Sequence, residues 1–243
     1  MDDWHLVHLG RFAIGGAGIV FTEATAVQKA GRITHGCPGL WCDSQIPSHA
    51  KVAQFALRNG AIPAIQLGHA GRKGGMQRPW HGNGPLNTAD FERGDMPWTP
   101  VGPSEIPVAE GWPLPHALTT SEIKNLIKDY VAAAQRALAA GYKIAEIHGA
   151  HGYLVHSFLS PLSNKRNDDY GGNLEGRMRL ALEITQAARA LWPENLPLFF
   201  RTSAVDGVPE GWSLEDTVIL AHALKAAGVD VMDCSSGGIA ASA

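Results

Sequence analysis

The sequence carries no excess of charge of one sign and no long apolar run. Its 20 Lys and Arg residues are balanced by 23 Asp and Glu, which gives a net charge of -3 without a basic cluster. Nucleic acids and anionic membranes bind concentrated positive charge, so neither is an expected partner. No apolar stretch approaches the roughly 20 residues that a membrane span requires. The first residues, Met1 to His5, are acidic and polar, and we expect no signal peptide.

Cysteine is also scarce. Cys37, Cys42 and Cys234 are the three cysteines, and no two of them form a Cys-x-x-Cys pair. An odd count without this spacing argues against a disulfide framework and against a zinc ribbon. A reducing compartment suits such a chain, so we expect a cytoplasmic protein.

The remaining composition is that of a globular protein, with 45% hydrophobic and 18% charged residues. A length of 243 residues is enough to bury a sizeable core. No internal repeat, linker or low-complexity tract interrupts the chain. We therefore expect a single domain over residues 1–243. A long loop excursion at about 68–118 is rich in Gly, Pro and Trp, and its tryptophans either cover a pocket or pack the excursion itself.

Strand-like and helix-like segments alternate along the chain. Apolar runs that end in polar residues predict five strands, at 17–24, 61–67, 144–148, 196–201 and 229–234. Helical periodicity and end signals predict helices at 6–14, 44–59, 119–141, 174–191 and 213–227. Asp43 is the expected cap of the second helix, and Thr119 and Glu122 form the capping box of the third.

Strands separated by helices of this length predict a parallel sheet, which either closes as a barrel or is doubly wound. A doubly wound nucleotide fold shows Gly-x-Gly-x-x-Gly after its first strand, whereas Gly16-Ala17-Gly18 lies before a strand. Polar or reactive residues stand at the carboxyl end of every predicted strand: Glu23, Gln66, His148, Arg201 and Cys234. Because (β/α)8 barrels carry their active sites there, we predict an α/β fold of the TIM-barrel type.

The segment His148-Gly149-Ala150-His151-Gly152-Tyr153 places two imidazoles and a phenol at one strand end. Three interpretations are open. The histidines bind a metal together with Glu23 or His69, they are structural residues of a polar loop, or they form an electrophilic pocket. In the third case two N–H groups stabilise negative charge on a carbonyl oxygen, and the tyrosine supplies a proton. We favour the third interpretation and predict no metal.

The same segment resembles the Old Yellow Enzyme family of FMN-dependent ene reductases, in particular its bacterial NADPH dehydrogenase and xenobiotic reductase class. Further matching motifs lie in family order over nearly the whole chain. They are Glu23-Ala-Thr-Ala-Val27, Gly31-Arg-Ile-Thr34, Gln66-Leu-Gly-His-Ala-Gly-Arg72, Phe158-Leu-Ser-Pro-Leu-Ser-Asn164, Asp169-Tyr-Gly-Gly172, Arg201-Thr-Ser203 and Asp233-Cys-Ser-Ser-Gly237.

The resemblance implies a (β/α)8 barrel that binds FMN, is reduced by NADPH and passes hydride to an α,β-unsaturated small molecule. It implies that His148 and His151 bind the substrate carbonyl and that Tyr153 is the proton donor. It implies a further set of flavin-binding residues, namely Ala24, Gln66 and Arg201. Negative charge that develops near flavin N1 on reduction is compatible with a fixed guanidinium at position 201.

The family barrel has eight strands, and the five predicted here correspond to strands 2–6. We therefore expect an incomplete barrel, truncated at both ends, with weak FMN retention and impaired activity as an isolated chain. Two open sheet edges would expose apolar surface, so a homo-oligomer or another partner chain that closes the sheet is a further expectation. Two alternatives remain: a non-catalytic fragment that folds only with a partner, and a metal-dependent barrel hydrolase that uses His148 and His151.

Overall fold

The computed structural model describes residues 1–240, so the last three residues of the expected domain, 241–243, lie outside the described part. Its centre is a parallel sheet in the order β1-β3-β6-β7-β8, with the short β2 also pairing with β3. The bounds are β1 (Ile19–Phe21), β2 (Thr25–Ala26), β3 (Ile62–Gly68), β6 (Ile144–Gly149), β7 (Leu198–Ser203) and β8 (Val231–Ser235). All five predicted strands are confirmed.

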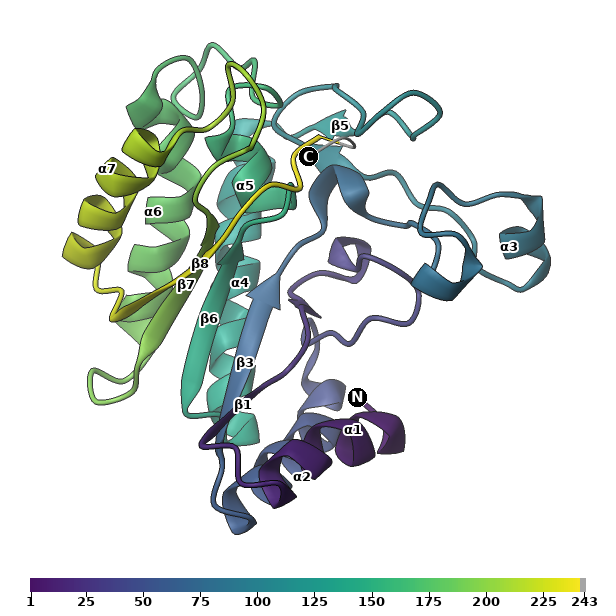
Figure 1. Ribbon diagram of the computed structural model, residues 1–243, viewed down its shortest axis with the longest axis vertical. Helices are drawn as coiled ribbons and strands as arrows, with labels where there is room; N and C mark the ends of the chain where they lie inside the picture. Colours follow the sequence, from purple (N-terminus) through teal and green to yellow (C-terminus); the bar gives the residue numbers. More distant parts are fainter. Residues whose placement is uncertain (241–243) are drawn as a thin grey trace.

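The long helices form one layer beside this sheet (Figure 1). They are α1 (Asp3–Ile14), α2 (Ile46–Arg58), α4 (Thr120–Ala140), α6 (Leu174–Leu191) and α7 (Leu214–Ala226). Each helix contacts the next one along the chain, α1 with α2, α2 with α4, α4 with α6 and α6 with α7. A doubly wound sheet has helices on both faces and a reversal of strand order, and residues 1–240 show neither. The predicted fold class is confirmed: this is part of a (β/α)8 barrel wall.

The two faces of the sheet have opposite characters because side chains alternate along each strand. One face packs against the helices and is apolar, with buried residues that include Ile65, Leu67, Ala145, Ile147, Leu198 and Phe200. The other face, here called the open face, carries polar side chains toward the carboxyl ends of the strands. They are Gln66, Glu146, His148, Arg201 and Asp233. The fold therefore places these polar side chains together on the open face, at the carboxyl ends of the strands.

The start of the second helix differs from the prediction. Residues Asp43–Gln45 form a single 3-10 turn, and the α-helix begins at Ile46 with Pro47 in its first turn. Proline has no N–H to donate to a carbonyl four residues earlier, so an α-helix starting at Ser44 would lack that bond. Asp43 was wrongly predicted as the cap, and its carboxylate instead accepts a 2.7 Å hydrogen bond from Arg136 Nε.

Short elements appear where none was predicted. The excursion contains two 3-10 turns, η3 (Gly71–Lys73) and η4 (Pro79–His81), a helix α3 (Thr88–Glu92) and a two-stranded parallel sheet of β4 (Val101–Gly102) with β5 (His116–Ala117). A further helix, α5 (Leu154–Leu159), follows β6. All six α5 residues are buried, so this helix has no solvent-facing side to create the periodic pattern that reveals a surface helix.

Two features of the surface bear on partners. Ile19 on β1 and Val231 on β8 are exposed, and both lie on edge strands of the sheet, as expected for open edges. Within residues 1–240, no helix combines the length and the apolar character needed to cross a bilayer.

Removing the cap of α4 is expected to destabilise the protein. Thr119 accepts a hydrogen bond from the Glu122 amide, while the Glu122 carboxylate accepts one from the Thr119 amide, as the capping-box prediction requires. Thr119→Ala leaves a helix-end donor unpaired, so we expect a loss of about 1 kcal/mol and a melting temperature lower by about 2–4 °C. Thermal unfolding followed by circular dichroism measures this. Ser121→Ala, on the same exposed turn, is the control, and an equal shift in both variants would contradict the role of the cap.

Candidate functional site

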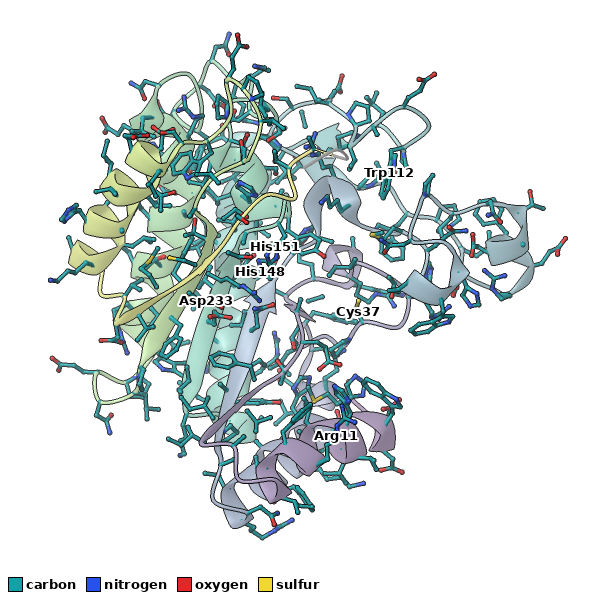
Figure 2. All side chains as sticks on the ribbon, viewed as in Figure 1. Arg11, Cys37, Trp112, His148, His151 and Asp233 are labelled. Atoms are coloured by element: carbon teal, nitrogen blue, oxygen red, sulfur yellow. The ribbon has the colours of Figure 1, made fainter. Side chains whose placement is uncertain are left out.

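The two histidines of the 148–153 segment lie at the carboxyl edge of β6, near the middle of the molecule (Figure 2). His148 is buried in the strand and points to the open face. His151 follows the strand with φ at +60°, a left-handed backbone that non-glycine residues rarely adopt. Gly149 between them lies against β7, where an added Cβ would be 2.4 Å from the Phe200 ring. The tight strand packing thus explains why a glycine separates the two histidines.

Hydrogen bonds define which imidazole nitrogen carries a proton. His148 Nδ1 accepts from the Ala150 amide at 3.2 Å, so its proton is on Nε2. That Nε2 lies 3.3 Å from His151 Nδ1, and His151 Nε2 lies 2.7 Å from Ser235 Oγ. Donation from His148 Nε2–H to His151 Nδ1, and from His151 Nε2–H to Ser235 Oγ, is consistent with two neutral rings.

The electrostatic surroundings also favour neutral rings. The pKa of His148 is lowered to about 3, first by burial and then by the nearby His151 and Arg201. The pKa of His151 is lowered too, first by burial and then by Arg201, His156 and Lys73. A neutral imidazole whose pKa is lowered in this way is a poor proton acceptor at physiological pH but still donates a hydrogen bond through its N–H group. The arrangement therefore suits polarisation of an oxygen atom.

Tyr153 lies beside both histidines. Its ring centroid is 5.0 Å from that of His148 and 6.4 Å from that of His151. Burial raises the pKa of Tyr153 to about 12, and the neighbouring Cys37 contributes to this rise. The phenol therefore keeps its proton at neutral pH, as a proton donor must.

Tyr153 also lines a cavity of about 970 Å³ between the excursion, the N-terminal helix and the loop around Cys37. Trp4, Trp80 and Trp112 contribute to its wall. Trp98 serves a different purpose, since its Nε1 donates to the Ala30 carbonyl and its ring packs on Arg32. Two tryptophans of the excursion thus line a cavity, and one holds the excursion to the preceding loop. A cavity of this size accommodates a small-molecule ligand.

Gln66 is held by a glutamate that the sequence analysis did not identify. Its Nε2 donates a 2.8 Å hydrogen bond to Glu146 Oε1 on the adjacent strand. This bond leaves the second N–H and the side-chain oxygen of Gln66 for a ligand. Glu146 precedes His148 by two residues in β6, so strand periodicity alone places both on one face, and that signal would have revealed it.

Arg201 lies at the same edge, beside a second acidic residue that the sequence analysis passed over. Its Nε is 3.2 Å from Asp233 Oδ2 on β8. The alternation of β8 directs Asp233 to Arg201 and leaves its neighbour Cys234 exposed on the other face. Ala24 lines a small cavity together with His148 and Tyr153. The structure thus brings all six predicted site residues to one edge of the sheet.

The residues proposed as additional metal ligands are engaged elsewhere. His69 accepts from the Gly71 amide through Nδ1 and contacts Gln28 Oε1 through Nε2, and Glu23 pairs with His5 at 3.2 Å. Among residues 1–240, no group of three or more His, Cys, Asp and Glu side chains lies close enough to bind one metal ion. The arrangement does not supply the third ligand that the metal interpretation needs.

Titration of Glu146 is expected to make stability depend on pH. Burial raises its pKa from 4.5 to about 6, and this effect outweighs the hydrogen bond from Gln66, which acts in the opposite direction. Between pH 4.5 and 6 the folded state therefore binds more protons than the unfolded state, and its stability falls as the pH rises through this window. We expect a loss of about 2 kcal/mol across it.

Chemical denaturation of the wild type and of Glu146→Gln at several pH values measures this contribution. The difference between the two proteins isolates Glu146, since the other titrating groups are shared. The variant should become more stable relative to the wild type as the pH rises from 4.5 to 6, and a difference that stays constant with pH would rule out the raised pKa.

Comparison with known proteins shows similarity along the whole chain. The family model described as NADH:flavin oxidoreductase / NADH oxidase matches residues 1–243. An NADH:flavin oxidoreductase of Gibberella zeae is 45% identical over 248 aligned residues, covering 98% of this chain and 60% of that protein. An NADPH dehydrogenase of Bacillus cytotoxicus is 40% identical, covering 98% of this chain and 63% of that protein. The chain therefore spans about three fifths of the length of these relatives.

Solved structures with the same fold include a 2-naphthoyl-CoA reductase in complex with 2-naphthoyl-CoA, with a TM-score of 0.84 and 27% identity over 98% of this chain and 36% of that one. An old yellow enzyme homologue from Zymomonas mobilis has a TM-score of 0.78 and 26% identity, over 94% of this chain and 63% of that one. Morphinone reductase in complex with tetrahydroNAD matches with a TM-score of 0.78 and 26% identity, over 95% of this chain and 63% of that one.

Proposed function

The chain belongs to the NADH:flavin oxidoreductase / NADH oxidase family, and from this we propose that its site reduces the C=C bond of an α,β-unsaturated carbonyl compound with NADPH as the hydride source. The observation that carries the proposal is the grouping of His148, His151 and Tyr153 beside Gln66 and Arg201 at one sheet edge. FMN, when bound, accepts hydride from NADPH and delivers it to the alkene carbon.

The open face fits a flavin because it offers the polar groups that an isoalloxazine edge requires. The Gln66 amide has one N–H and its oxygen unused by Glu146, which suits the mixed donor and acceptor edge of the ring. The Arg201 guanidinium is a permanent positive charge that stabilises negative charge on a reduced flavin. Ala24 lines a cavity of about 10 Å³ together with His148 and Tyr153, and its methyl group adds little bulk next to these side chains.

The substrate would bind through its carbonyl oxygen. Both rings are neutral and carry a proton on Nε2. A carbonyl oxygen that accepts from these groups in place of His151 Nδ1 and Ser235 Oγ is polarised without being protonated. A polarised carbonyl makes the β-carbon more electrophilic. Tyr153 then gives its proton to the α-carbon, since its raised pKa keeps the hydroxyl protonated until the transfer.

Incubation with FMN, desalting and an anaerobic absorbance spectrum test this function. Because the chain carries only part of the barrel, we expect a weakly retained flavin band, which NADPH bleaches and 2-cyclohexenone restores. A chain that retains no flavin would contradict the proposal. A reduced flavin that dioxygen reoxidises but enones do not would leave an oxidoreductase that is not an ene reductase. Turnover that a chelator abolishes would instead favour the metal-dependent hydrolase.

The cellular setting is part of the same proposal. The three cysteines are free, which suits a reducing compartment, and we place the protein in the cytoplasm. The exposed Ile19 and Val231 lie on opposite edge strands of the sheet, and each edge offers apolar surface against which a second copy of the chain would pack.

A further inference from the structure

A buried histidine–aspartate pair lies directly behind the 148–153 segment, and the reaction proposed above does not use it. His156 on α5 and Asp206 in the loop after β7 both have side chains with 0% exposure, and His156 Nε2 is 2.8 Å from Asp206 Oδ1. Ser160 Oγ and the Trp212 amide donate to Asp206 Oδ2 at 2.6 and 2.7 Å. Burial opposes ionisation of Asp206, but these partners outweigh it and hold the pKa of Asp206 below its usual value. Such a pair is costly to bury and is expected to have a specific role.

The other nitrogen of His156 contacts the backbone of the candidate site. The Gly152 amide donates a 2.7 Å hydrogen bond to His156 Nδ1, which leaves the His156 proton on Nε2, toward Asp206. Gly152 stands between His151 and Tyr153, and its φ is +72°. A Cβ at this position would lie 2.1 Å from the Gly238 carbonyl oxygen, so the backbone here is closely confined.

The left-handed backbone at His151 requires such restraints, since an unusual φ persists only where neighbours enforce it. Ser203 Oγ accepts from the His151 amide at 2.9 Å, and Lys73 Nζ donates to the His151 carbonyl at 2.9 Å. These two contacts hold the residue before Gly152. His156 supplies the restraint on Gly152 itself, and Asp206 orients the imidazole that makes it.

We propose that His156, oriented by Asp206, is a positioning residue that fixes Gly152 and thereby sets the placement of His151 relative to Tyr153. The pair connects the loop after β7 to the loop after β6, so residues that follow two neighbouring strands together fix the backbone of the site. The part of this inference that concerns catalysis depends on the proposed function, whereas the part that concerns backbone placement does not.

Two substitutions separate the two contacts of His156. In His156→Asn the side-chain oxygen takes the place of Nδ1 and keeps an acceptor for the Gly152 amide. In His156→Gln the amide nitrogen takes the place of Nε2, which keeps the contact with Asp206 and removes the acceptor. His49 is the matched control, since it is also fully buried and contacts Tyr142 Oη and the Gly39 carbonyl, away from the site. His49→Asn and His49→Gln report the effect of losing a buried histidine as such.

Hydrogen exchange followed by mass spectrometry on residues 148–158 tests placement without any bound cofactor. We expect exchange in His156→Gln to be faster by about tenfold, the effect of one lost hydrogen bond, and exchange in His156→Asn to stay close to wild type. The His49 variants should leave this segment unchanged. Equal acceleration in both His156 variants, or no acceleration in either, would overturn the proposal.

A second readout concerns the site itself. In FMN-loaded protein, His156→Gln should weaken binding of a phenol by about tenfold and leave flavin reduction by NADPH unchanged, while His156→Asn restores the phenol affinity. If His156→Gln loses both flavin reduction by NADPH and phenol binding, the site is generally disrupted, which would contradict a positioning role. Wild-type protein that fails to reduce enones would refute the proposed function alone, because the exchange result stands without it.

Discussion

Replacement of His148 and His151 by alanine together is expected to slow enone reduction by at least about a hundredfold and to weaken the binding of phenols. Removal of one donor that stabilises oxyanion charge typically costs about 3 kcal/mol of transition-state stabilisation. The two rings contact each other at 3.3 Å, so we expect their effects not to add and the double variant to be only moderately slower than either single one. Stopped-flow reoxidation of the reduced, FMN-loaded protein by 2-cyclohexenone measures this step.

Two comparisons make that result specific. Reduction of the flavin by NADPH should suffer much less than enone reduction, because it requires no carbonyl polarisation. His151→Asn retains an N–H donor and should lose less than His151→Ala, whereas His222→Ala on the exposed part of α7 should lose nothing. Enone turnover in the double variant at the wild-type rate would remove the two histidines from the mechanism.

Tyr153→Phe is expected to slow the same step by about a hundredfold or more, the usual contribution of a positioned general acid. The phenylalanine ring keeps the packing on His148 and Lys73 while the proton is lost. Because the pKa of Tyr153 is raised to about 12, the wild-type rate should not depend on its ionisation between pH 6 and 9. Product formation under single-turnover conditions, in H2O and in D2O, measures the proton transfer.

The control for this variant is an electron acceptor whose reduction does not require protonation of a carbon atom. Ferricyanide should reoxidise the reduced flavin of Tyr153→Phe and of the wild type at equal rates, and phenol binding should change little. If Tyr153→Phe reduces the enone as fast as the wild type, another group or water donates the proton. If ferricyanide oxidation is also slowed, the substitution has disturbed the flavin site and not the proton transfer.

Local sequence was a good guide to the elements of the fold. The capping box of Thr119 and Glu122 was readable because it depends on residues within one helical turn. The prediction was wrong at Asp43. Aspartate is a common capping residue, but Pro47 shifts the start of the α-helix to Ile46. It missed α5, since a fully buried helix shows no amphipathic period.

The candidate site was predicted in part. The residues 148, 151 and 153 lie close together in the chain. Two histidines and a tyrosine at this spacing indicate a polar site even when the fold is not known. The contact of Asp233 with Arg201 was not predicted, because it follows from the pairing of β8 with β7. The functional interpretation of Gln66, Arg201 and Ala24 came from a family resemblance and remains a proposal.

Short-range order, the alternation of strands and helices and the chemical character of the 148–153 segment follow from the sequence, because each depends on neighbours along the chain. The partners of those residues follow only from the tertiary structure. Glu146 meets Gln66 across 80 residues, and Asp206 reaches His156 from another loop. Such contacts form when parallel strands align and bury their polar groups together, since a buried charge is stable only beside a partner. No local pattern specifies which partner that will be.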